Sequence, residues 1–164
     1  MPNYWKTQGI PHKGWRLINV IDVREDGQSE SDTNYECCMM CGNEKIRYVH
    51  IVSHDEVADE FCVGCNCAAR MTDDYVNPER REAKLRNRAN RRVSWSRKQW
   101  KYSKSDNLFL NYENHFLLIF KDKYSGKFKI RIDERISKKT YDDIDLAKIA
   151  VFKNIEHMKE NDKW

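Results

Sequence analysis

Cysteine residues concentrate in two short stretches of this chain, and their spacing is typical of metal ligands. Cys38 and Cys41 are separated by two residues in "CCMMCG", and a glycine follows them directly. Two thiolates at this spacing can hold one ion from a tight turn, which the glycine permits. Cys62, Cys65 and Cys67 in "FCVGCNC" follow 21 to 26 residues later. Two short cysteine clusters joined by a segment of hairpin length predict a structural Zn²⁺ site.

The composition favours metal binding over disulfide bonds for these cysteines. The chain has 164 residues, 34% of them charged, and a mean hydropathy of −0.90. No stretch approaches the roughly 18 to 20 consecutive apolar residues of a membrane span, and the first residues lack the apolar core of a signal peptide. We therefore expect a cytoplasmic protein without a membrane partner. In the reducing cytoplasm, clustered cysteines are more often metal ligands than disulfides.

Spacing alone leaves the fourth zinc ligand open. Cys38, Cys41 and Cys65 fit almost any tetrahedral arrangement, whereas the remaining ligand could be Cys62, Cys67 or a histidine. The six cysteines and the two histidines between the clusters would also suffice for two tetrahedral sites. Free buried cysteines, the alternative to a metal site, would be expected to scatter along the chain.

The two histidines between the cysteine clusters are limited by their own separation. His50 and His54 are four residues apart, so on a helix they could share one ion. On a strand they would lie roughly 13 Å apart, and at most one could join the site. Either histidine could instead be the general base of a metal-dependent nuclease of the HNH type, which a treble-clef module can host.

The elements predicted around the cysteines are those of a treble-clef or zinc-ribbon-like module. "KIRYVHIVSHDEVADEFCVG" is predicted to form two strands flanking a loop, and "CNCAARM" the start of a helix. A cysteine turn, a hairpin and a helix N-terminus would then converge on one ion. Upstream, "WRLINVIDV" is an apolar run typical of a buried strand, and residues 24–34 form a polar loop.

The motifs C-x-x-C-G, I-R-Y-V-H-x-x-x-H and V-G-C-x-C-A follow one another in this chain. In this pattern the sequence resembles a family of small, uncharacterised bacterial zinc-binding proteins, over residues 38–155. The pattern includes both histidines and omits Cys37 and Cys62. The resemblance implies Cys38, Cys41, Cys65 and Cys67 as the zinc ligands, with His54, His50 and Cys62 in reserve. It implies no particular activity.

Residues 79–104 carry most of the positive charge of the chain. They contain 11 lysines and arginines against 2 glutamates, a net charge of +9, so the remaining residues sum to −5 within the total of +4. The segment lacks glycine and follows Pro78, which predicts a helix. Trp95, Trp100 and Tyr102 could stack on bases while the cations neutralise phosphates. Alternatively, the helix is a solvated connector whose tryptophans belong to the core.

The last third of the chain predicts a three-stranded antiparallel sheet packed on one helix. The strands are expected over residues 107–112, 115–121 and 127–133. In the third strand Lys127, Lys129 and Arg131 alternate with apolar residues and form a basic outer face. A helix is expected from Thr140, because a Thr-x-x-Asp capping box there precedes apolar residues at helical spacing.

These features together predict an α+β protein in four parts. The parts are an N-terminal strand and polar loop (1–35), a zinc-binding module (36–75), a basic helical segment (76–104) and a sheet-plus-helix module (105–164). The predicted function is binding of DNA or RNA with a structural Zn²⁺ ion. The predicted nucleic-acid surface comprises Lys84, Arg88, Arg91, Arg92, Arg97, Lys98, Lys127, Lys129 and Arg131. The alternatives are an HNH-like nuclease that uses His50 or His54, and an adaptor that binds an acidic protein partner.

Overall fold

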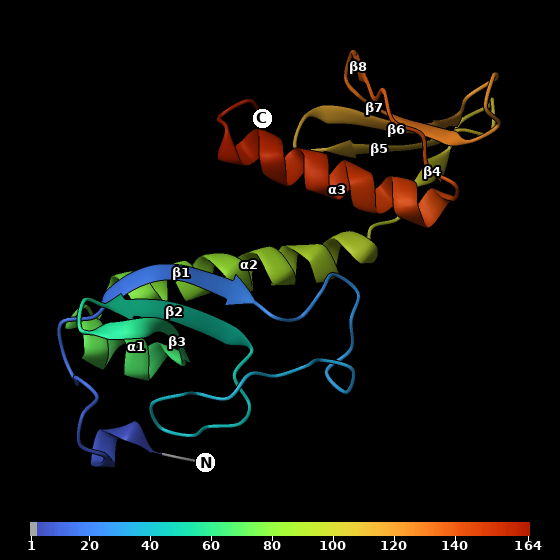
Figure 1. The fold of residues 1–164 in the computed structure, drawn as a ribbon. Helices are drawn as coiled ribbons and strands as arrows, with labels where there is room; N and C mark the ends of the chain where they lie inside the picture. The colour runs from blue at the N-terminus through green and yellow to red at the C-terminus, as the bar shows by residue number, and fades with distance from the viewer. Residues whose placement is uncertain (1–2) are drawn as a thin grey trace. The chain divides into compact units, whose positions relative to one another are not determined.

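The protein has a mixed α+β fold, as the sequence predicts, and the computed structural model describes residues 3–164 (Figure 1). The chain divides into two compact units, the first ending at Val93 and the second running from Ser94 to Trp164. The boundary falls near the end of the long helix α2 (Asn77–Ser96), inside the predicted basic segment. No helix among the described residues has an apolar stretch long enough to cross a membrane.

The first unit is built on an antiparallel sheet with the strand order β1-β2-β3. Its elements are the 3₁₀ helix η1 (Tyr4–Lys6), the strands β1 (Arg16–Asp22), β2 (Tyr48–His54) and β3 (Val57–Val63), and the helices α1 (Cys65–Thr72) and α2. The predicted hairpin is confirmed, because β2 and β3 pair across a two-residue turn. The strand β1, expected in a separate N-terminal part, pairs with β2 along its length. The strand and the hairpin therefore share one sheet.

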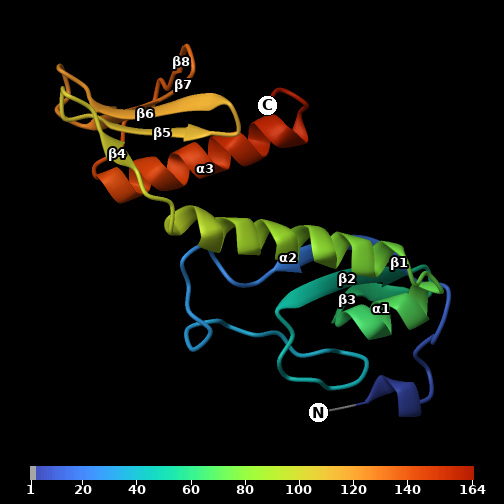
Figure 2. The ribbon, with the colours of Figure 1, turned by 180° about the vertical axis from the view of Figure 1, so that it is seen from behind.

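A single core holds the first unit together. Trp15, Met40, Val52, Val63 and Met71 are buried in it and come from five different parts of the chain. The helix α1 packs on β1 and β2, and in both views α2 lies along β1 and β2 (Figure 1, Figure 2). Because the sheet has only three strands, this core is small, and the loop before β2 contributes Met40 to it without regular secondary structure of its own.

The second unit is an antiparallel sheet of five strands with one helix against it. Its elements are β4 (Lys101–Tyr102), β5 (Leu108–Tyr112), β6 (His115–Lys121), β7 (Phe128–Ile132), β8 (Arg135–Ile136) and α3 (Ile144–Glu160). The three predicted strands match β5, β6 and β7 to within one residue at each end. The two-residue strands β4 and β8 extend the sheet at its edges.

The start of α3 differs from the predicted capping box at Thr140. The helix begins at Ile144, and its N-cap is Asp143, whose side chain accepts a hydrogen bond of 2.8 Å from the Leu146 amide. The chain cannot turn into a helix earlier because Tyr141 is held extended by two 2.8 Å backbone hydrogen bonds to Phe128. Asp143, which was predicted as the second member of a capping box, is therefore the N-cap residue of α3.

The tryptophans of the basic segment belong to the core of the second unit. Trp95 is only 4% exposed, and its indole Nε1 donates to the Lys148 carbonyl at 2.9 Å. Trp100 packs edge-on against Trp95, with ring centroids 5.9 Å apart. These two side chains are therefore core residues, as the connector alternative expects, while Tyr102 remains 66% exposed.

Glu113 should make the second unit sensitive to acid. Lys159 and then Trp164 hydrogen-bond its carboxylate, which lowers its pKa from 4.5 to about 2. A lowered folded-state pKa stabilises the fold above about pH 4.5, and this stabilisation is lost as the pH falls towards 2. Because the side chain is 45% exposed, we expect Glu113→Gln to cost no more than about 1 kcal/mol at pH 7 and nothing near pH 2.

Urea unfolding followed by the indole NMR signal of Trp95 measures this difference. Glu134→Gln, which changes an exposed carboxylate in the turn between β7 and β8, is the matched control and should match the parent at both pH values. An equal loss of stability for Glu113→Gln at pH 7 and pH 2 would mean that its charge contributes nothing.

Candidate metal centre

Three cysteines converge at one end of the sheet in the first unit. The sulfur atoms of Cys38, Cys41 and Cys67 all lie within 4.8 Å of one another, and all six cysteines of the chain are free thiols. Cys38 and Cys67 are buried, whereas Cys41 is exposed. Three converging sulfur donors form the chemistry that Zn²⁺ and other thiophilic ions prefer. These residues can therefore hold a metal ion.

The backbone around Cys38 and Cys41 forms a closed turn. The Gly42 amide donates to the Cys38 carbonyl at 2.8 Å, and Gly42 has a φ of 78°, which a residue with a side chain rarely adopts. Between the two cysteines, Met40 is fully buried in the core and Met39 donates its amide to the Cys62 carbonyl at 2.9 Å. Core packing and β3 thus anchor the turn while its sulfur atoms face α1.

The sulfur atoms of the cluster interact electrostatically even without a cation. Interaction with the nearby Cys67 thiol lowers the pKa of Cys38, and the same interaction raises the pKa of Cys67. The indole Nε1 of Trp5 also lies 3.4 Å from the Cys67 sulfur. This N–H donor supports negative charge on Cys67, as hydrogen bonds around metal-bound thiolates do. Trp5 was not among the predicted site residues, because it precedes the first cysteine by more than 30 residues.

A second group of potential ligands gathers beside the first. Ligand atoms of His50, Cys65 and Glu82 lie within 4.8 Å of one another. These residues come from β2, the first turn of α1 and the second turn of α2. The His50 side chain is completely buried, and that of Glu82 is 14% exposed. Burial and the nearby carboxylate of Glu82 raise the pKa of Cys65 to about 11.

Residues of both groups line one cavity of about 470 Å³. Cys38, Cys41 and Cys67 of the first group line it together with Cys65 and Glu82 of the second. Lys45 and Arg47 also line it, and Arg47 is held by Asp22 through two hydrogen bonds of 2.8 and 2.9 Å. Solvent or a small ligand in this cavity would therefore meet ligand atoms from both groups.

The structure divides the four predicted zinc ligands between the two groups. Cys38, Cys41 and Cys67 come together, whereas Cys65 lies with His50, a reserve ligand, and with Glu82. The reason is helical geometry: Cys65 and Cys67 are both in α1, and two residues correspond to about 200° of rotation about a helix axis. Their side chains therefore leave the helix on different sides.

The other reserve ligands lie in neither group of the described residues. His54 accepts a hydrogen bond from the Glu56 amide at 3.1 Å, and its ring packs on Trp15 with centroids 5.3 Å apart. Cys62 lies in β3, and its amide contacts the Met39 sulfur at 3.2 Å. Glu82 was not predicted, because a single glutamate in a charged helix has no spacing that marks it as a ligand.

Many cations of the predicted nucleic-acid surface have partners within the protein. Arg88 makes two hydrogen bonds of 3.1 Å to Asp26, Lys127 pairs with Asp142 at 2.8 Å, and Lys129 pairs with Asp122 at 3.2 Å. Arg131 lies over the Phe116 ring and Lys98 over the Tyr112 ring. The side chains of Lys84, Arg91 and Arg97, on or just beyond α2, are exposed. Part of the predicted basic surface is thus neutralised locally.

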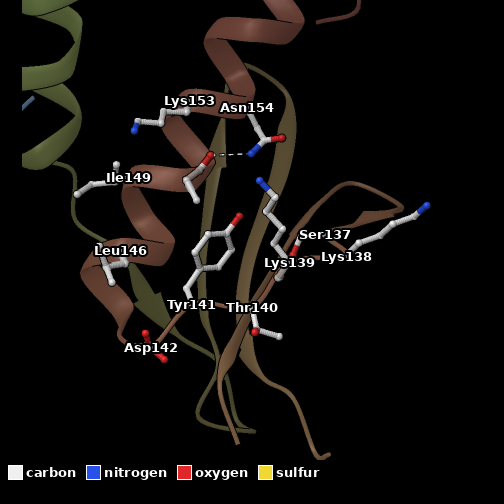
Figure 3. Close-up of a pocket in the computed structure, with 11 residues that line it drawn as sticks. Ser137, Lys138, Lys139, Thr140, Tyr141, Asp142, Leu146, Ile149, Lys153 and Asn154 are labelled. Carbon is white, nitrogen blue, oxygen red and sulfur yellow. Dashed lines mark hydrogen bonds between the residues drawn. The ribbon is translucent and has the colours of Figure 1, made fainter. Parts of the chain in front are cut away.

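A groove of about 590 Å³ in the second unit gathers further lysines (Figure 3). Its walls are the segment 137–142 and one face of α3. Lys138, Lys139 and Lys153 line it and form no ion pair with any residue among those described. Figure 3 shows the Lys139 ammonium and the Tyr141 hydroxyl both extending along the groove towards Asn154. The groove was not predicted, since Lys153 lies 15 and 14 positions after Lys138 and Lys139 and only the fold brings these segments together.

Replacing a cysteine of the first cluster should release its metal. We expect Cys41→Ser to weaken metal binding by the cluster more than about 100-fold, since changes to residues that only support ligands already cost 10- to 100-fold. Competition with a chromophoric chelator measures this loss. Cys37→Ser is the matched control, because Cys37 is a neighbouring free cysteine outside both groups. Equal affinities for the two variants would remove Cys41 from the ligand set.

Comparisons of this chain with protein-family models, with curated proteins and with solved structures each find no match. The resemblance to a bacterial zinc-binding family therefore stays a prediction from the motifs. The features that bear on function are the two ligand groups, their shared cavity and the distribution of charge.

Proposed function

We propose that this chain is a zinc-stabilised protein that binds nucleic acid. The zinc ion would be held by Cys38, Cys41 and Cys67, whose three sulfur atoms within 4.8 Å are the observation that carries this part of the proposal. Its role would be structural, because it would join the turn before β2 to the N-terminal half of α1. Structural zinc sites contribute on the order of 10 kcal/mol to folding at neutral pH. Such a contribution suits a unit with a small core.

Nucleic-acid binding is supported by the uneven distribution of charge. Residues 79–104 carry a net charge of +9, while the rest of the chain is negative. Within this segment the side chains of Lys84, Arg91 and Arg97 are exposed. Phosphate neutralisation by such residues supplies most of the affinity of proteins that bind nucleic acids without sequence preference. The three lysines of the groove in the second unit would add to this attraction.

The positions of the two histidines do not favour the nuclease alternative. His50 is completely buried, so it cannot reach a phosphodiester from its place in β2. His54 lies in neither ligand group of the described residues, and its Nδ1 accepts a backbone hydrogen bond. A general base must lie within hydrogen-bond reach of the water that it activates. Binding without cleavage is therefore the proposed activity.

Fluorescence anisotropy at several salt concentrations tests this proposal directly. A labelled duplex, an RNA hairpin and a single strand should each be titrated with the zinc-loaded protein between about 50 and 200 mM salt. We expect an affinity that falls steeply with salt. Replacing Lys84, Arg91 and Arg97 together by alanine should reduce the slope of log K against log salt by about 2 to 3, since each phosphate contact contributes 0.7 to 0.9.

The matched control removes the same charge elsewhere. Lys6, Lys123 and Lys163 are exposed lysines outside the basic segment, and their joint replacement by alanine should leave the slope nearly unchanged. Equal effects of the two triple variants would assign the binding to overall charge. An absence of binding to all three polymers would overturn the proposal and favour an acidic protein as the partner.

The groove of the second unit gives a separate prediction. If it contacts phosphates, Lys139→Ala combined with Lys153→Ala should weaken binding several-fold and lower the salt slope by about 1 to 2. The control is Lys121→Ala with Lys123→Ala, which removes two lysines from the end of β6 and the turn after it. An unchanged slope in the groove variant would confine the contacts to the basic segment.

A further inference from the structure

We propose that His50, Cys65 and Glu82 form a second divalent-cation site, separate from the zinc site of the three cysteines. Their ligand atoms lie within 4.8 Å of one another. The three residues are separated by 15 and 17 positions in the sequence and come from three different elements. The fold alone brings them together. This inference goes beyond the proposed function, which needs only the cysteine cluster.

The three donor atoms suit a metal ion that is neither strongly hard nor strongly soft in its choice of ligands. An imidazole nitrogen, a thiolate and a carboxylate oxygen are each common ligands of Zn²⁺, and the same mixture accommodates Co²⁺. Ca²⁺ and Mg²⁺ are disfavoured, because they take oxygen ligands almost exclusively. The expected ligand is therefore a transition-metal dication.

The surroundings of His50 contain more acceptors than a neutral imidazole can satisfy. Nδ1 lies 3.3 Å from the Tyr48 carbonyl oxygen, and Nε2 lies 3.1 Å from the Pro78 carbonyl oxygen and 3.8 Å from a Glu82 carboxylate oxygen. A neutral ring has only one N–H. If Nδ1 donates to Tyr48, the Nε2 lone pair points towards oxygen atoms in a fully buried place. A cation bound at Nε2 would use this lone pair and would lie close to both oxygen atoms.

A hydrogen bond can also hold the His50 ring in the orientation that a metal ligand needs. Metal-binding histidines commonly donate their other ring N–H to a backbone carbonyl, which holds the ring in one orientation. The Tyr48 carbonyl is placed to accept such a bond from Nδ1. Nε2 then lies 3.1 Å from the Pro78 carbonyl oxygen and 3.8 Å from a carboxylate oxygen of Glu82, the second residue of the site.

A divalent cation would balance the charge that the group carries once it binds a metal. Glu82 is largely buried, and Arg86 one turn along α2 is the cation paired with it. Cys65 would lose its proton on metal binding, and the group would then carry two negative charges against the single charge of Arg86. Uncompensated charge in a buried place is strongly unfavourable. A divalent ion would compensate both ligands and allow Arg86 to keep its contact with the carboxylate.

The proposed site leaves room for a further ligand. Zn²⁺ is usually four-coordinate, so an ion held by His50, Cys65 and Glu82 would keep one position open for water or another ligand. Cys65 and Glu82 line the cavity of about 470 Å³, so a fourth ligand could enter from it. The second ion would therefore be accessible to small molecules.

Metal stoichiometry tests the proposal on the full chain. The purified protein should be stripped of metal, dialysed against Zn²⁺ or Co²⁺, and analysed by mass spectrometry of the elements. We expect two ions in each chain. Glu82→Gln and Cys65→Ser should each reduce this number to one. Glu79→Gln, an exposed carboxylate one turn earlier in α2, is the matched control and should retain two ions.

Cobalt spectra identify which ion is lost. Thiolate-to-Co²⁺ charge-transfer absorption should weaken equally in Cys65→Ser and in Glu82→Gln, and the absorption that remains should be that of the three-cysteine site. The remaining ion also reports that each variant is folded, because the cysteine cluster joins separate elements of the same unit.

The possible outcomes separate this proposal from the proposed function. The parent protein could instead bind one ion that Cys65→Ser loses and Glu82→Gln keeps. Cys65 would then be the fourth ligand of the cysteine cluster, and this result would overturn the second site alone. If the parent protein binds one ion and both variants keep it, His50, Cys65 and Glu82 do not bind metal. This result would also overturn the second site. No bound ion in the parent protein would overturn both proposals.

Discussion

The first unit depends on the convergence of three sulfur atoms from two separate segments. Residues 37–45 form no helix or strand, and an isolated bridge between Glu36 and Ile46 is the only sheet-like pairing at their ends among the described residues. Their position is instead set by the buried Met40 side chain and by the contact of Cys38 and Cys41 with Cys67. A cation between the sulfur atoms would join them by strong coordination bonds. The loop, the sheet and α1 would then become one cooperative unit.

Local patterns in the sequence were sufficient to predict most of the regular structure. The strands of the second unit were predicted because each alternates or concentrates apolar residues between turn-forming residues, and the core residues Leu117, Ile119 and Ile130 fall within them. Two-residue strands such as β4 and β8 carry no such periodicity and could not be predicted. The start of α3 was misplaced for a related reason, since the long-range pairing of Tyr141 with Phe128 overrides a local capping signal.

The candidate site was predictable only in part. Sequence spacing identified the cysteine clusters, but it could not assign Cys65 and Cys67 to different groups, because this depends on the direction in which each side chain leaves α1. Glu82 and Trp5 enter the site through tertiary packing alone. The basic surface shows the same limit: Arg88 was predicted to face a nucleic acid, yet it is paired with Asp26, 62 positions earlier. Net charge in a segment does not reveal which of its cations are already neutralised.

The short edge strands of the second unit have a consequence for self-association. Both edges of its sheet, β4 and β8, are only two residues long. A sheet edge exposes unpaired backbone N–H and C=O groups, on which an extended segment of another molecule can add as a new strand. Two residues offer too little of this template for stable pairing, and Lys101 and Arg135 place a positive charge on each edge. The short, charged strands thereby disfavour edge-to-edge aggregation along the parts of β5 and β7 that they cover.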